Sequence, residues 1–322
     1  MAIPSDPKID GFDILQAPYK RVGENDIRCD VLVPRTPFQG QRPVIIRWHG
    51  GGLVTGDSLL MTIWVPWLSD LALKHEAIII SPNYRVMPEA TSAQIYEDVE
   101  DLWKWVHSST LSNLLASHST PASLDLSRIM TVGESAGGSL SLYLALSHPD
   151  QIRSVTASYP SVDFTTPAYT VPRTGPVWGF NAPLSVFEEI DRNAVIGSGV
   201  SSIVGPERLA FMISVIQHGK IGEVYLRGSE GVEKEVLFPL ARLEKTREVP
   251  RGGIVILQGQ EDSLILASET EEFVQRAREL TREEDITYVV REGEEHGFDV
   301  NVTLDEVWLQ DSLKRAVDTW LE

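Results

Sequence analysis

The sequence contains one cysteine, no long apolar run and no basic stretch, and each absence excludes a class of proteins. Cys29 alone cannot form an internal disulfide, and we expect it to be an inert strand residue. The longest apolar runs, such as residues 77–80, are far too short to cross a bilayer. The net charge of −18 argues against nucleic-acid partners and against anionic lipid surfaces. Neither H-E-x-x-H nor C-x-x-C occurs, so we expect no metal and no other cofactor.

The N-terminal residues carry neither a basic region nor an apolar one, so we expect no secretory signal there. The chain has 322 residues, of which 42% are hydrophobic and 23% charged, values that are ordinary for a globular protein. This length suffices for one large α/β domain with a substantial core. We therefore expect a single-domain, cytoplasmic protein without stable membrane insertion.

The most informative stretch surrounds Ser135. An apolar run at 128–132 meets the pentad Gly-Glu-Ser-Ala-Gly at 133–137, and a leucine-rich stretch follows at 139–146. This order predicts a strand that turns sharply into a helix with Ser135 at the apex. Such a turn needs small neighbours and a strained backbone, and it places the serine where a helix N-terminus favours negative charge. The pentad alone is weak evidence, because chance produces one in roughly 0.1 of chains of this length.

A second motif lies upstream of the pentad. His49, Gly50, Gly51 and Gly52 directly follow the apolar run 44–48, and chance produces this tetrad in roughly a few chains per thousand. Lipases and esterases combine such a glycine loop with the Ser-containing turn. Together the two motifs favour nucleophilic catalysis by a serine.

Apolar runs alternate with helical patterns along most of the chain, which predicts a mostly parallel sheet with helices on both faces. The predicted strands are 27–33, 43–48, 77–80, 128–132, 155–159, 253–259 and 286–291. The predicted helices are 59–74 (with a kink or boundary at Pro66), 93–107, 139–146, 183–190, 207–217, 267–280 and 304–321. The rhythm breaks at about 164–240, which we interpret as a helical cap. The first 26 residues are expected to form an irregular or partly helical arm. The catalytic core would then comprise about 26–163 and 241–322.

A serine needs a base, and the base needs a carboxylate to orient it. Asp262 and His296 each follow a predicted late strand, so both should emerge at the edge of the sheet where Ser135 lies. Glu261 and Asp299 remain rival acids. His49 is expected to anchor the glycine loop rather than to act as the base.

The oxyanion hole should be formed by backbone N–H groups of Gly51, Gly52 and Ala136. Four aromatic residues are candidates for the wall of a substrate pocket, although each could equally pack in the core. They are Trp64, Trp178, Phe180 and Phe211.

These motifs resemble the hormone-sensitive-lipase family of α/β-hydrolases. The resemblance rests on 49–52, Asn83-Tyr84-Arg85 with Pro88-Glu89, 133–138, the Asp262 loop and His296-Gly297-Phe298. It implies an α/β-hydrolase fold with a cap built from an N-terminal arm and an insertion, here about 1–25 and 164–240. It also implies Ser135, Asp262 and His296 as the triad, and Gly51, Gly52 and Ala136 as oxyanion donors. Glu134 stands where many members have Asp, a departure that we expect to leave the chemistry untouched.

We therefore expect a serine hydrolase that cleaves carboxylic esters of small, largely apolar molecules, with short to medium acyl chains, through an acyl-enzyme. A specialised lactonase, deacetylase or acyltransferase is the main alternative, since the triad serves all of them. The family also includes plant hormone receptors that have lost the histidine, and the presence of His296 argues against that class. The expected partner is a small-molecule ester, and the sequence is compatible with either a monomer or a homodimer.

Overall fold

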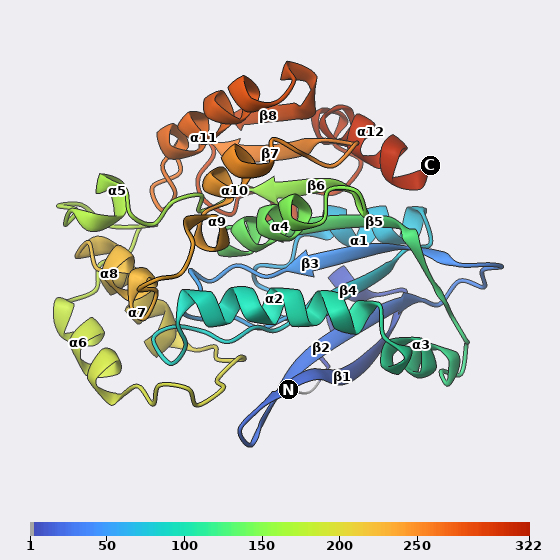
Figure 1. Cartoon of the computed structure of the whole chain (residues 1–322), viewed down its shortest axis with the longest axis horizontal. Helices are drawn as coiled ribbons and strands as arrows, with labels where there is room; N and C mark the ends of the chain where they lie inside the picture. The colour runs from blue at the N-terminus through green and yellow to red at the C-terminus, as the bar shows by residue number, and fades with distance from the viewer. Residues whose placement is uncertain (1–2) are drawn as a thin grey trace.

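An eight-stranded sheet forms the centre of the computed structural model, which describes residues 3–322 (Figure 1). The strands lie in the order β1-β2-β4-β3-β5-β6-β7-β8. The pairs β1–β2 and β2–β4 are antiparallel, and all other neighbours are parallel. The predicted mostly parallel sheet is thus confirmed. The strands are β1 (Phe12–Val22), β2 (Asn25–Pro34), β3 (Arg42–Trp48), β4 (Ile78–Pro82), β5 (Leu124–Glu134), β6 (Ile152–Ser158), β7 (Ile254–Gly259) and β8 (Ile286–Arg291).

Both faces of the sheet are buried, which explains why its central strands are continuous apolar runs. Successive side chains of a strand point to opposite faces. On β3, Val44 and Ile46 join one apolar core, whereas Ile45 joins the other. The helices α1 (Pro66–Lys74) and α12 (Val307–Leu321) cover the face of Ile45. The opposite face is covered mainly by α2 (Ser92–Val106), α4 (Ala136–Ser147) and α11 (Ala267–Leu280).

The other helices complete the connections between these layers. They are α3 (Ser109–Ala116), α5 (Pro167–Thr170), α6 (Leu184–Asn193), α7 (Pro206–Gln217), α8 (Ile221–Leu226), α9 (Lys234–Leu237) and α10 (Pro239–Thr246), with 3₁₀ turns η1 (Pro7–Ile9), η2 (Glu283–Asp285) and η3 (Phe298–Asn301). Pro66 proves to be a helix boundary, because α1 begins there, where a proline loses no helical hydrogen bond. No helix among residues 3–322 is both long and apolar enough to cross a membrane.

The prediction that the first 26 residues form an irregular or partly helical arm is wrong. Residues 12–22 form β1, which pairs with β2 along its whole length, from Phe12 opposite Pro34 to Val22 opposite Asn25. The arm therefore belongs to the sheet and not to a cap; residues 1–2 lie outside the described part of the chain.

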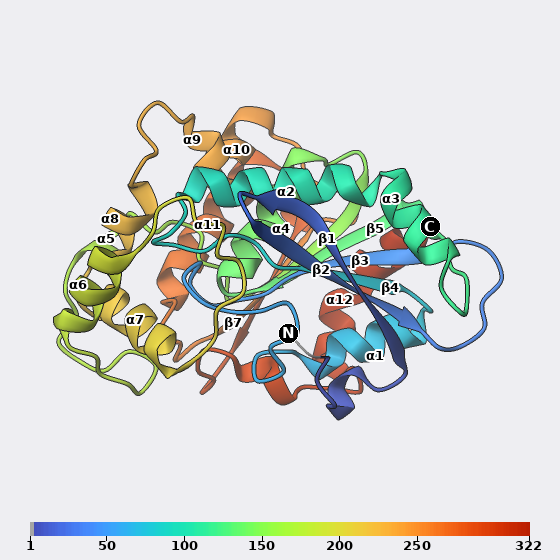
Figure 2. The ribbon, with the colours of Figure 1, turned by 90° about the horizontal axis from the view of Figure 1, so that it is seen from below.

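As predicted, the alternation of strands and helices stops after β6. Its helices α5 to α8 lie together at one end of the molecule in both views (Figures 1 and 2). The short helices α9 and α10 then return to the helical layer, where α9 contacts α2 and α10 packs on α4 and α11.

Candidate active site

Ser135 occupies the sharp turn between β5 and α4. Its φ of 56° and ψ of −123° lie in a region of backbone conformation that residues other than glycine rarely adopt. A Cβ at Gly133 would collide with the carbonyl oxygen of Gly137, and a Cβ at Gly137 would collide with that of Trp48. The two glycines of the pentad are therefore sterically required, and they hold Ser135 at the carboxyl end of the sheet.

His296 and Asp262 meet above the same edge. The imidazole Nδ1 lies 2.8 Å from Asp262 Oδ2. The other carboxylate oxygen, Oδ1, accepts the backbone N–H groups of Leu264 and Ile265 at 2.9 and 2.7 Å. Asp262 is 3% exposed, so these bonds fix the carboxylate and, through it, the plane of the imidazole.

The two rival acids lie elsewhere. Glu261 is exposed next to Asp262. Asp299 is buried and accepts hydrogen bonds from the Tyr159 hydroxyl at 2.6 Å and the Ser158 hydroxyl at 2.8 Å. Asp262 is therefore the carboxylate that contacts His296.

The glycine loop after β3 is anchored by His49. The His49 Nδ1 lies 2.7 Å from the Gly50 carbonyl oxygen, and the ring stacks on Tyr84 with centroids 4.3 Å apart. Burial lowers the pKa of His49 to about 4, so the ring is neutral near pH 7 and Nδ1 donates this bond. Gly51 and Gly52 have φ of 119° and 62°, which glycine adopts at little cost. Within residues 3–322, the N–H groups of these two glycines donate to no protein acceptor.

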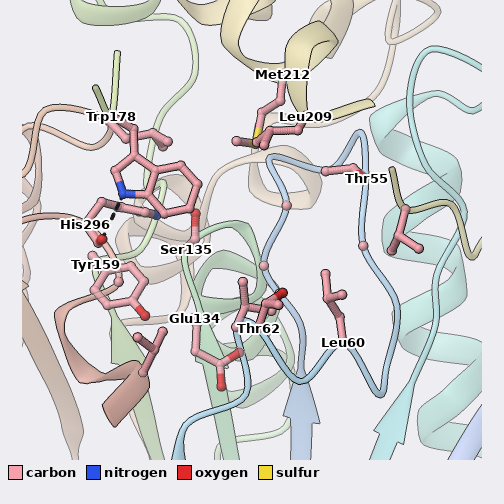
Figure 3. A pocket seen from close by; sticks show the side chains of 18 of the residues that line it. Thr55, Leu60, Thr62, Glu134, Ser135, Tyr159, Trp178, Leu209, Met212 and His296 are labelled. Carbon is pink, nitrogen blue, oxygen red and sulfur yellow. Dashed lines mark hydrogen bonds between the residues drawn. The ribbon is translucent and has the colours of Figure 1, made fainter. Parts of the chain in front are cut away.

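A cavity of about 400 Å³ opens above the sheet edge and contains both Ser135 and His296 in its wall (Figure 3). Most of its lining is apolar. It is lined by Gly50, Gly51, Thr55, Gly56, Leu60, Thr62, Ile63, Glu134, Ser135, Tyr159, Trp178, Val204, Gly205, Leu209, Met212, Leu264, His296, Gly297 and Val300. The cavity size suits a small ester.

Of the four predicted pocket aromatics, the structure places only Trp178 in this wall. Trp64 is buried on the other side of the sheet, where its indole N–H donates to Ser69 Oγ at 2.9 Å. Phe211 is fully buried and stacks on Phe187, and Phe180 is 51% exposed. The prediction that Trp64, Phe180 and Phe211 line the pocket is therefore wrong, because core packing or solvent takes these side chains away from it.

Trp178 connects the helical insertion to the catalytic loops. Its indole N–H donates to the His296 carbonyl oxygen at 3.1 Å, and its backbone N–H donates to Ser263 Oγ at 3.0 Å. The indole ring also meets the imidazole edge-on, with centroids 6.0 Å apart. Nothing local in the sequence signals these contacts, which join segments 85 and 118 residues apart.

Glu134, which stands where many members of the family have Asp, is a further residue of the cavity. It precedes Ser135, lines the cavity and is 2% exposed. Its Oε1 accepts the Nε–H of Arg47 at 3.1 Å. Burial raises the pKa of Glu134 to about 7, although the Arg47 guanidinium opposes that shift. Glu134 thus lies in the cavity wall, and the expectation that it leaves the chemistry untouched stays a prediction.

The described residues include no group of three or more His, Cys, Asp or Glu side chains that could hold a metal ion. The strained serine, the imidazole–carboxylate pair and the glycine loop instead define the arrangement of a serine hydrolase on a doubly covered parallel sheet.

Comparison with known proteins agrees with this class. Residues 45–189 match a family model described as the alpha/beta hydrolase fold. The chain is 32% identical to the probable carboxylesterase M8 of Phoma sp., over 99% of this chain and all of that protein. It is 44% identical to the probable carboxylesterase clz11 of Cochliobolus lunatus, over 36% of this chain and 56% of that protein. The crystal structure of an esterase from Rhizomucor miehei superposes with a TM-score of 0.62, at 20% identity, over 98% of this chain and 88% of that one.

The chain therefore belongs to the hormone-sensitive-lipase and carboxylesterase-type family of α/β-hydrolases, a family of carboxylic ester hydrolases.

Proposed function

We propose that the protein hydrolyses carboxylic esters of small, largely apolar molecules in two steps through an acyl group on Ser135. The observation that carries this proposal is the hydrogen bond of 2.8 Å between Asp262 and His296, because His296 lines the same cavity as Ser135. An imidazole held in this way has its second nitrogen free to accept a proton. The mostly apolar cavity of about 400 Å³ supports esters with short to medium acyl chains.

In the first step, His296 Nε2 accepts the proton of the Ser135 hydroxyl while Oγ attacks the acyl carbon. The negative charge that develops on the acyl oxygen is stabilised by the N–H groups of Gly51, Gly52 and Ala136. Ala136 is the first residue of α4, so its N–H has no partner within the helix. Collapse of the intermediate breaks the bond to the alcohol oxygen, which takes the proton from His296.

In the second step, His296 accepts a proton from a water molecule, whose oxygen attacks the acyl carbon. Collapse of this intermediate releases the carboxylic acid and returns the proton to Ser135. Asp262 stays ionised throughout and stabilises the imidazolium that forms in each step. The cycle therefore consumes one water and one ester and needs no cofactor.

The substitution Ser135→Ala tests this proposal. The variant should retain the fold, by circular dichroism and melting temperature, and lose hydrolysis of p-nitrophenyl butyrate by several orders of magnitude. Ser147→Ala is the matched control, because Ser147 lies at the far end of the same helix and its hydroxyl donates to the Tyr143 carbonyl. Unchanged turnover by Ser135→Ala would end the assignment, and a wild type that turns over no activated ester would favour a binding protein.

A further inference from the structure

Arg173 lies between α5 and α6 in the helical insertion, and its side chain reaches the loop that carries Asp262. Its Nη1 donates to the Ser263 carbonyl oxygen at 2.5 Å, and its Nη2 donates to that of Leu264 at 3.3 Å. Nε and Nη2 also donate to the carbonyl oxygen of Ala168 in α5, at 3.1 and 2.9 Å. The guanidinium is therefore fixed on its own segment and holds two consecutive carbonyl groups of a catalytic loop.

The two peptide groups that accept from Arg173 also donate to the catalytic carboxylate. A peptide group joins a carbonyl to the N–H of the next residue, and in the trans form the two point in opposite directions. The group between Ser263 and Leu264 presents its oxygen to the guanidinium and its N–H to the carboxylate oxygen Oδ1. The group between Leu264 and Ile265 is arranged in the same way. Two consecutive peptide groups thus bridge Arg173 and Asp262.

The charges at the two ends of these bridges match the peptide dipoles. The negative oxygen ends face a guanidinium, which is always charged in proteins, and the positive N–H ends face a carboxylate. Hydrogen bonds linked in this way polarise one another, and bonds to charged groups are stronger than neutral ones. The bridges therefore hold Asp262 Oδ1 in place and leave Oδ2 to accept the hydrogen bond of His296 Nδ1 at 2.8 Å.

We propose that Arg173 is a positioning residue for the catalytic carboxylate and acts on it through these two peptide groups. The helical insertion then contributes to the rate of the reaction as well as to the wall of the cavity. This inference rests on the proposed hydrolysis at Ser135.

Loss of the guanidinium should slow catalysis without weakening the binding of the ester. The two carbonyl groups would lose the donors that fix them, so the N–H groups would orient Asp262, and through it His296, less precisely. Arg173 itself is not one of the described residues that line the cavity. The effect should therefore appear in kcat and not in KM.

The substitutions Arg173→Met and Arg173→Lys separate hydrogen bonding from packing. Methionine keeps much of the apolar stem but has neither donor nor charge, whereas lysine keeps a charged donor that lacks the planar fork of arginine. In hydrolysis of p-nitrophenyl butyrate, kcat should fall at least about tenfold in Arg173→Met, the usual effect of hydrogen bonds to a charged group. It should fall only about threefold in Arg173→Lys, and KM should stay within about twofold in both variants.

Arg227→Met is the matched control. Arg227 is also a half-buried arginine of the 164–240 segment, but it binds the carboxylate of Asp191 in α6, at 2.6 and 3.2 Å, and not a catalytic loop. This variant removes a comparable anchor of the insertion and should leave kcat within about twofold of the wild type. A loss of kcat in Arg227→Met equal to that in Arg173→Met would overturn the proposal.

The Arg173 variants can refute the inference in three further ways. Equal losses of kcat in Arg173→Met and Arg173→Lys would show that packing alone matters, and a loss expressed in KM would place the effect in binding. An unchanged kcat in Arg173→Met would also overturn the proposal. If Arg173→Met does not fold, Arg173→Lys decides, because an unchanged kcat in that variant would overturn the inference.

The wild type separates this inference from the proposed function. Hydrolysis by the wild type together with an unchanged Arg173→Met would overturn the role of Arg173 and leave catalysis at Ser135 intact. A wild type that hydrolyses no activated ester would instead overturn the proposed function, and the inference with it.

Discussion

Asp262→Asn should almost abolish catalysis, because the structure fixes which way the new amide must point. Asp262 Oδ1 accepts two backbone N–H groups, so the amide oxygen must take this place. The NH₂ group then replaces Oδ2, which lies 2.8 Å from His296 Nδ1 and 3.2 Å from Gln258 Nε2. Gln258 cannot turn to accept it, because its Nε2 also donates to two carbonyl groups and its Oε1 accepts the Thr270 hydroxyl.

The donor at position 262 therefore forces His296 into the other tautomer. Nδ1 becomes the acceptor, Nε2 carries the proton, and the imidazole can no longer accept the proton of Ser135. The equivalent change in a serine protease lowers kcat by about 10⁴, and we expect a loss of that order here. The interactions that bind the ester remain, so KM should change little.

Steady-state hydrolysis of p-nitrophenyl butyrate measures this loss. Glu261→Gln is the matched control, because it makes the same kind of change at an exposed neighbouring position and should leave kcat unchanged within about twofold. An Asp262→Asn enzyme that keeps more than a tenth of the wild-type kcat would refute the reasoning. An equal loss in Glu261→Gln would refute it as well.

Three further outcomes are expected. Trp178→Phe keeps an aromatic side chain but removes the indole N–H bond to the His296 carbonyl, so kcat for p-nitrophenyl butyrate should fall by up to about tenfold. An unchanged kcat would count against a role for this contact. Burial lowers the pKa of His49 from 6.5 to about 4, so between these pH values the unfolded chain binds a proton that the native protein does not. The free energy of unfolding, measured with urea, should therefore fall as the pH is lowered from 6.5 to 4. It should fall less steeply in His49→Gln. Because burial raises the pKa of Glu134 from 4.5 to about 7, native protein holds the extra proton there, so the free energy of unfolding should fall relative to Glu134→Gln as pH rises from 5 to 8.

The parts of the molecule that follow local rules could be predicted from the sequence. The turn at Ser135 requires glycine at 133, because a Cβ there would collide with the carbonyl oxygen of Gly137 in the turn that follows, and this local requirement is part of the pattern that identifies the turn in the sequence. Strands that are buried on both faces are continuous apolar runs, and β3 and β7 were predicted to within a residue at each end. Parallel strands bring their carboxyl ends to one edge, and this rule placed Asp262 and His296 next to each other although 34 residues separate them.

The strand β1 escaped prediction because it lies at the edge of the sheet. Its side chains are mostly half-exposed, so the sequence shows no alternation between apolar and polar residues. It also contains Pro18, next to the point where its register with β2 shifts. Edge strands tolerate proline and irregular pairing, and both features favour a loop when the sequence is considered alone.

The side chains around the cavity depend on distant segments, which is why apolar character alone misplaced them. Trp64 is an aromatic residue near the glycine loop, yet it packs in the core that α1 and α12 cover, where the Arg47 guanidinium lies over its ring and Ser69 Oγ accepts its indole N–H. Arg47 also donates a hydrogen bond to Glu134, so one buried arginine contacts both an aromatic residue that does not line the cavity and a carboxyl of a residue that does. Because the acidic residue directly before Ser135 is oriented from β3, its identity at this position matters through length as much as through charge. A shorter Asp would withdraw the carboxyl by one methylene, so the hydrogen bond of 3.1 Å from Arg47 Nε depends on a glutamate at this position.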